Sequence, residues 1–159
     1  MSGLNWTLAP CLKQWGRQRL ENIHRLILET TGETYDIDRL QELPLDEKFG
    51  RWVLTDGTTD KGILWVMQLS NQCARVLAFS ISNNLQGNGM GAEGWRRFAG
   101  AATSSGIRTV QLEVRQDNEV AIAMYHRRGL RPKGRIVGFY RGHDGWLMRG
   151  TLLSESASQ

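Results

Sequence analysis

Residues 109–130 read TVQLEVRQDNEVAIAMYHRRGL, and they predict a strand followed by a helix. Within the predicted strand, 109–114, apolar and polar side chains alternate. The apolar residues are Val110, Leu112 and Val114, and the polar ones, with the residue that follows, are Gln111, Glu113 and Arg115. A parallel strand between two helices is normally apolar on both faces, so one face here must be wet or paired. The polar face either lines a cleft at the carboxyl end of the strand or carries an ion pair of Glu113 with Arg108 or Arg115.

The helix predicted over 118–128 starts at an N-cap, Asp117 or Asn118, and stops at Gly129. Asn118, Ala121 and Tyr125 share one of its faces by their spacing. The small Ala121 would let a ligand approach, and Asn118 offers an amide. Tyr125 is either a core tyrosine or a side chain whose hydroxyl points into the same cleft as Glu113.

Upstream, residues 86–92 read QGNGMGA and lie between a predicted strand, 75–81, and a predicted helix, 89–103. Glycines in such a loop let backbone N–H groups converge, and the amino end of the helix adds partial positive charge. Together these features bind a diphosphate without a cationic side chain. The alternative is a tight turn with no ligand.

Residues 89–94 also fit the GxGxxG pattern of dinucleotide-binding folds, with Glu113 near the expected place of the ribose-binding acid. Two observations weigh against this interpretation. Residues 82–88 separate the strand from the glycines, whereas the dinucleotide motif begins at the strand end. Only one helix and a hairpin follow, which is too little for the second half of a doubly wound sheet.

The rest of the chain supplies strands around this unit. Further helices are predicted at 11–29 and 38–43, and further strands at 4–8, 51–55, 62–69, 135–140 and 146–152, with residues 51–81 as an antiparallel meander. This order predicts an α/β (α+β) fold with a mixed, mostly antiparallel sheet and helices on both faces. We expect one domain over 1–153 and a disordered tail over 154–159.

Composition narrows the class of protein. The 159 residues suit a single domain without stabilising metal, and no apolar run is long enough for a membrane span. Cys11 and Cys73 lack metal-site spacing, and together these features favour a cytoplasmic protein. Residues 81–159 carry 11 Lys and Arg against six Asp and Glu. Because no basic run is interleaved with aromatics, this charge favours a phosphorylated small molecule over nucleic acid.

These residues together resemble the GNAT acetyltransferase superfamily, most closely the ribosomal-protein-alanine N-acetyltransferases of the RimI type. Gln86, Gly89 and Gly91 match its Q/R-x-x-G-x-G/A signature. Residues 112–130 are similar to its LEVR-x-x-N-x-x-A-x-x-x-Y-x-x-x-G-F segment, with Leu130 in place of Phe. The resemblance is clear from 76 to 130, extends plausibly to 152, and fades before 76.

The resemblance implies acetyl-CoA as cosubstrate, no metal, Glu113 as general base and Tyr125 as general acid. It also implies a set of cofactor-binding residues in the strand end, the glycine loop and the next helix. These are Phe79, Ser80, Ile81, Gln86, Gly87, Asn88, Gly89, Met90, Gly91, Ala92 and Asn118. Gly87 and Asn88 depart from the family, which often has a cation there, and Gly94 and Gly100 weaken the following helix.

The expected reaction is acetyl transfer to a primary amine, foremost the N-terminal α-amine of a protein. The alternatives are a small-molecule amine, a lysine side chain, or an acyl-CoA-binding module without catalysis. No membrane or nucleic-acid partner is expected, and the sequence leaves the oligomeric state open, a homodimer included. Residues 29–47 contain seven carboxylates and one cation, Arg39, which favours either a solvated loop or a wall that attracts a cationic acceptor.

Overall fold

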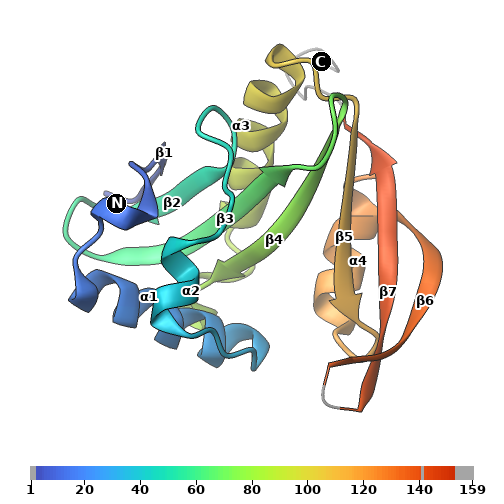
Figure 1. Cartoon of the computed structure of the whole chain (residues 1–159), viewed down its shortest axis with the longest axis horizontal. Coiled ribbons are helices and arrows are strands. Elements are labelled where there is room, and N and C mark those ends of the chain that lie inside the picture. Colours follow the sequence, from blue (N-terminus) through green and yellow to red (C-terminus); the bar gives the residue numbers. More distant parts are fainter. Residues whose placement is uncertain (1–2, 141, 153–159) are drawn as a thin grey trace.

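The computed structural model describes residues 3–140 and 142–152 of the chain. Its strands form one sheet in the order β1-β2-β3-β4-β5-β7-β6, in which only β4 and β5 pair in parallel (Figure 1). The strands are β1 (Asn5–Leu8), β2 (Arg51–Thr55), β3 (Asp60–Gln68), β4 (Cys73–Ile81), β5 (Thr109–Arg115), β6 (Arg131–Tyr140) and β7 (His143–Thr151). The helices are α1 (Arg17–Thr31), α2 (Ile37–Gln41), α3 (Met90–Ser104) and α4 (Glu119–Arg127), with short 3-10 turns η1 (Leu12–Gln14) and η2 (Asn83–Leu85). The predicted fold class and element order are confirmed.

Both faces of the sheet are covered, and the pattern of β3 explains how. Ile63 and Trp65 point to the face that packs under α1, whereas Leu64 and Val66 point to the face under α3. Successive side chains of a strand alternate between faces, so the buried centre of this strand, residues 63–66, is apolar on both faces. The antiparallel meander predicted for residues 51–81 is confirmed.

The first helix begins later than the sequence predicts. The expected helix over 11–29 is a 3-10 turn at Leu12–Gln14 followed by α1 from Arg17. Trp15 lies in the connection, donates its indole N–H to the Pro10 carbonyl at 3.2 Å and packs edge-on against Trp65. This tertiary anchor, which periodicity does not reveal, separates the turn from the helix.

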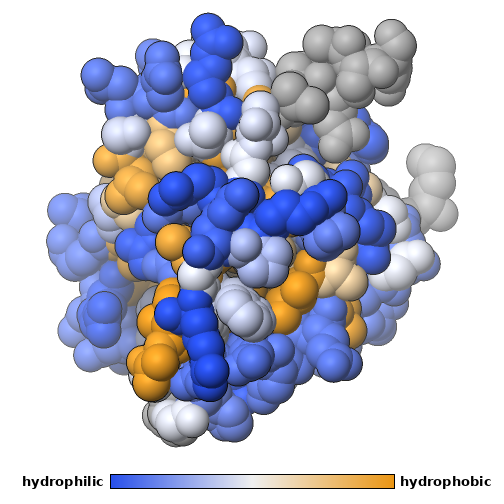
Figure 2. Space-filling model, turned by 90° about the vertical axis from the view of Figure 1, so that its right-hand side faces the viewer, coloured by the Kyte–Doolittle hydropathy of each residue, from blue (hydrophilic) through white to orange (hydrophobic). Residues whose placement is uncertain are grey.

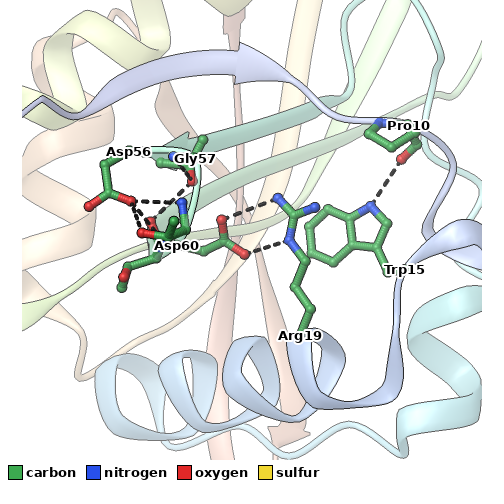
Figure 3. Close-up of polar contacts among 9 residues, drawn as sticks. Pro10, Trp15, Arg19, Asp56, Gly57 and Asp60 are labelled. Carbon is green, nitrogen blue, oxygen red and sulfur yellow. Dashed lines mark hydrogen bonds and ion pairs between the residues drawn. The ribbon is translucent and has the colours of Figure 1, made fainter.

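An ion pair fixes α1 against the sheet. The Arg19 guanidinium donates to both carboxylate oxygens of Asp60, at 2.6 and 3.2 Å, and lies 3.9 Å over the Trp15 ring (Figure 3). The Asp60 side chain is almost buried, so the pair is better shielded than a surface salt bridge. The pair therefore holds the first turn of α1 against the start of β3.

The parallel pair β4–β5 is short, and the two strands diverge beyond it (Figure 1). Only Cys73–Arg75 pair with Thr109–Gln111, although both strands continue further. In β4, Leu77 is an extra residue relative to β3, because Trp65 pairs with Ala78 and Val66 with Val76. Such a bulge bends its strand and is common beside functional sites. From Val76 to Ile81, the edge of β4 toward β5 has no partner strand among the described residues.

The C-terminal hairpin also differs from the prediction. Its strands are longer than 135–140 and 146–152, and its turn is shorter than the predicted 142–145. β7 lies between β5 and β6, and its residues 145–151 pair with the whole length of β5. Hydrophilic side chains cover most of the face that this hairpin and α4 present (Figure 2).

Within the described part of the chain, no helix combines the length and apolar character needed to cross a membrane. The predicted disordered tail, 154–159, lies outside the described residues.

Candidate active site

Two cavities meet where β4 and β5 diverge. We call the first the carboxylate cleft: it has a volume of about 310 Å³ and is lined by Glu33, Arg75, Glu113, Arg115 and Tyr125 among others. The second, the glycine groove, has a volume of about 530 Å³ and runs past the loop that joins β4 to α3. Four residues line both cavities: Thr31, Phe79, Asn118 and Ala121. A ligand in the groove therefore reaches the cleft.

Glu113 lies on the polar face of β5 and opens onto the carboxylate cleft. Its carboxylate accepts hydrogen bonds from both the Nε and an Nη of Arg75 on β4. The ion pair that the sequence allowed with Arg108 or Arg115 is therefore not formed, and Arg115 pairs instead with Asp117 at 2.8 Å. A bidentate guanidinium fixes the orientation of Glu113 and compensates its charge in a partly desolvated position.

Tyr125 comes from α4 and reaches the same cleft. Its ring is buried, with centroids 6.4 Å from Phe79 and 6.1 Å from Trp95. Burial, and secondarily the charge of Glu33, raises the pKa of the Tyr125 phenol. The side chain therefore carries its proton at neutral pH, and the same burial makes the phenol a weaker acid than an exposed tyrosine.

Glu33 is the one carboxylate of the acidic segment 29–47 that lines the cleft, and the sequence did not single it out. It follows the left-handed Gly32 that ends α1, and its backbone N–H donates to the Thr31 hydroxyl at 3.1 Å. Burial raises the pKa of Glu33, while the Thr31 hydroxyl and the Arg115 charge oppose that rise. No local pattern distinguishes it from its neighbours, because its role depends on where α1 ends against the sheet.

The glycine groove collects nine of the eleven residues predicted to bind the cofactor; Asn88 and Met90 are the two that do not line it. Gly87 and Gly89 have φ angles of 82° and 79°, a conformation that other residues rarely adopt. Gly89 caps α3, whose first N–H groups have no partner within the helix and therefore remain available to a ligand.

Contacts from outside the loop fix its shape. The Gln86 side chain donates to the Ile81 carbonyl at 3.0 Å and so ties the loop to the end of β4. The Trp6 indole donates to the Met90 carbonyl at 2.8 Å at the start of α3. Its ring lies against Gly94, where a Cβ atom would come within 2.6 Å of it. Gly94, which weakens the helix by propensity, is thus required by packing.

The wall of the groove fits a thioester cosubstrate with an amide-containing arm. The unpaired edge of β4 offers backbone groups, and β-type pairing is a common way to bind an extended chain. Ser80 is buried and its hydroxyl has no hydrogen-bond partner, which is costly unless a ligand supplies one. Asn118 uses its side-chain oxygen to cap α4, accepting from the Ala121 N–H at 3.2 Å, and it lines both the groove and the cleft.

Comparisons with known proteins identify the family of the chain. The model of the acetyltransferase (GNAT) family matches residues 17–130. None of the curated proteins compared with the chain matches it.

Solved structures share the fold over nearly the whole chain. Ard1 from Thermoplasma volcanium is 20% identical with a TM-score of 0.83, covering 95% of this chain and 99% of that one. The ribosomal-protein-S18-alanine N-acetyltransferase from Escherichia coli is 15% identical with a TM-score of 0.77, covering 94% of each chain. A putative acetyltransferase from Salmonella typhimurium, solved with its cofactor acetyl-CoA, is 16% identical with a TM-score of 0.69, again covering 94% of each.

Since the family model spans well over half of the sequence, the chain belongs to the GNAT acetyltransferase family. It is an acyltransferase that uses acetyl-CoA as the acetyl donor for an amine. The resemblance noted from the sequence is confirmed, and the dinucleotide-binding interpretation is wrong. Within residues 3–140 and 142–152, no cluster of His, Cys, Asp and Glu is arranged to hold a metal ion.

Proposed function

We propose that this enzyme acetylates the N-terminal α-amine of a protein, with Glu113 as the general base and Tyr125 as the general acid. The observation that carries the proposal is the meeting of the two cavities. Side chains able to accept and to donate a proton open onto one cleft, and the cosubstrate groove ends at that cleft.

The proposed proton transfers belong to the usual chemistry of carboxylate and phenol side chains. A protein N-terminus has a pKa near 8, so a carboxylate can take its proton, directly or through a water, with a small energetic penalty. The neutral amine is then the nucleophile toward the acetyl thioester that acetyl-CoA supplies. Bulged β4 backbone at Leu77 lines the cleft and offers N–H groups toward the reacting carbonyl oxygen. The protonated phenol of Tyr125 donates its proton to the departing thiolate.

The acceptor is cationic before it reacts, and two of the side chains that line the cleft are carboxylates. Glu33 and Glu113 both line it, and Glu33 is the carboxylate contributed by the segment between α1 and α2. A protein N-terminus presents its charged amine at the end of an extended chain, which suits entry into an open cleft. The similarity of fold to an enzyme named for S18-alanine acetylation supports this class of acceptor.

The direct test is acetylation of a peptide array in which the first residues vary, with acetyl-CoA as donor. The proposal predicts that peptides with a free α-amine are acetylated, and that N-terminally blocked peptides with internal lysines are not. Spermidine and free lysine serve as small-amine acceptors in parallel. Faster turnover of a small amine or of blocked lysine peptides would reject the N-terminal acceptor, and no turnover with acetyl-CoA bound would favour the non-catalytic module.

A further inference from the structure

Two arginines reach the polar face of β5 from its neighbouring strands. From β7, Arg149 donates to the side-chain oxygen of Gln111 at 2.8 and 3.2 Å. From β4, Arg75 donates to both carboxylate oxygens of Glu113, with its Nε at 3.2 Å from one of them. Of these two arginines, Arg75 is the one that lines the carboxylate cleft. Its partner, moreover, is the side chain to which we assign the general base.

The Arg75–Glu113 pair lies where β4 and β5 separate (Figure 1). Arg75 is paired with Gln111 in the last step of the parallel ladder, and Glu113 follows two residues later on the same face of β5. Beyond that step, no backbone pairing joins the two strands in the described part of the chain. The guanidinium therefore links the strands at the point where the cleft opens between them.

The contact leaves Glu113 able to accept a proton. A carboxylate has about four lone-pair positions, and the two contacts with Arg75 use one on each oxygen. The Glu113 side chain is only 17% exposed, so bulk water does not compete strongly with the guanidinium. Because Glu113 also lines the cleft, an amine or a water molecule there can use the remaining positions.

We propose that Arg75 is a positioning residue for acetyl transfer, whose two-point contact holds the Glu113 carboxylate in one orientation toward the acceptor amine. This inference rests on the proposed role of Glu113 as general base. Without its partner, a glutamate side chain turns about several bonds, and misplacement of a reacting group by about 1 Å can cost about 10²-fold in rate. A lysine in place of Arg75 would keep the charge but not the planar pair of donors.

The test is a double-mutant cycle on kcat, measured with acetyl-CoA and the amine that the wild type acetylates fastest. We expect Arg75→Gln to lower kcat about 10- to 100-fold, with the Kd for acetyl-CoA changed less than about two-fold. In the Glu113→Gln background, the same substitution should change kcat less than about two-fold. The reason is that Arg75 acts through a carboxylate that this background has already lost.

Two further variants separate orientation from charge. Arg149→Gln is the matched control, because it removes the same charge and an arginine bound to the same face of β5, but one that does not line the cleft. It should leave kcat within about two-fold of the wild type. Arg75→Lys should give a kcat between those of the wild type and Arg75→Gln, since it retains the charge and loses the second contact.

The outcomes distinguish this inference from the proposed function. It is overturned if Arg75→Gln has the kcat of Arg149→Gln, if its effect is undiminished in the Glu113→Gln background, or if Arg75→Lys has wild-type kcat. Each of these results leaves Glu113 as the base when Glu113→Gln alone is slow. Wild-type kcat in Glu113→Gln rejects the base itself and, with it, the proposed mechanism and the role of Arg75.

Folding is checked in the same samples by thermal unfolding and by calorimetric binding of acetyl-CoA. The variant with both Arg75→Gln and Glu113→Gln leaves no unpaired charge in the cleft at this position, so it should fold even where the single change at Arg75 is destabilising. Arg75→Lys, measured with and without Glu113→Gln, gives the same cycle with the charge conserved and completes the test if Arg75→Gln does not fold.

Discussion

The carboxylate cleft and the glycine groove lie on either side of one junction but differ in charge. In the cleft, Glu33 and Glu113 are balanced by Arg75 and Arg115, whereas the groove contains two arginines and no carboxylate among its described lining residues. The groove thus has net positive charge suited to an anionic donor, and the cleft offers individual carboxylates to a cationic acceptor. The small residues at the junction, Thr31 and Ala121, let the two meet.

The two regions also differ in how they are held. In the cleft, the functional groups are side chains, and they are oriented by the Arg75–Glu113 ion pair and by aromatic packing around Tyr125. In the groove, most of the binding groups belong to the backbone, whose shape is set by glycines at positive φ and by Trp6 at the start of α3. Changes in the cleft should therefore affect the reaction rate, whereas changes in the groove should affect stability and cosubstrate binding.

The largest expected effect is catalytic and confined to the cleft. Glu113→Gln and Tyr125→Phe should each lower kcat about 10²–10⁴-fold, as for loss of general base or acid catalysis, with the Kd for acetyl-CoA nearly unchanged. Steady-state kinetics and calorimetry measure the two quantities separately. Wild-type turnover in both variants would show that Glu113 and Tyr125 have only structural roles.

Gly94→Ala tests the packing of Trp6 on α3, which shapes the glycine groove. The new methyl group would meet the Trp6 ring, so we expect a loss of about 1–3 kcal/mol in the free energy of unfolding, together with weaker CoA binding. Gly100→Ala in the same helix meets no atom within 4 Å and should stabilise by about 0.5–1 kcal/mol. Denaturant titration of both variants measures the difference, and equal effects would contradict the packing argument.

The charge of the acceptor peptide tests the role of the carboxylates in the cleft. At low salt, peptides with Lys or Arg near the N-terminus should exceed acidic ones in kcat/KM about two- to five-fold, and added salt should shrink this advantage. Glu33→Gln should reduce the preference, because this carboxylate lines the cleft. Glu47→Gln, an exposed change elsewhere in the same acidic segment, should not. Equal kcat/KM for basic and acidic peptides at low salt would exclude charge steering.

The smallest effect is the pH dependence of stability at Glu33. Burial raises the pKa of Glu33 above the 4.5 of an exposed glutamate, so the unfolded chain releases this proton at lower pH than the folded one. The ionised group therefore costs stability, and this cost develops as pH rises from about 4 through the folded pKa.

Glu33→Gln removes that cost. We expect its unfolding temperature to exceed that of the wild type by about 1–2 °C at pH 7.5 and to equal it at pH 4. A gain of the same size at both pH values would instead indicate an effect unrelated to ionisation. Thermal scans at the two pH values, with Glu47→Gln as control, make the measurement.

Local patterns were enough for the order of elements and for much of the site. The alternation in β5 correctly placed Glu113 on a polar face, and the spacing in α4 correctly brought Asn118, Ala121 and Tyr125 together. Element ends were less accurate, as at α1, where a tryptophan packed on a distant strand divides the predicted helix.

The partners of these residues could not be predicted. Arg75 is 38 positions from Glu113 and meets it because β4 and β5 pair in parallel before they diverge. Trp6 and Gly94 meet because β1 lies under α3. The arginines at the end of α4 read in the sequence as ordinary surface cations, and only the folded chain places them on the same groove as the glycine loop.

The sequence by itself determined which segments become strands and helices, which faces are apolar, and that a glycine loop precedes a helix, because these depend on residues a few positions apart. The tertiary structure alone decided that β7 lies between β5 and β6, that β4 and β5 separate after three residue pairs, and that Glu33 and Tyr125 line the same cleft. The reason is physical: strand order, bulges and cavity walls depend on how distant surfaces pack, and the free energy of that packing is not encoded in any short stretch of chain.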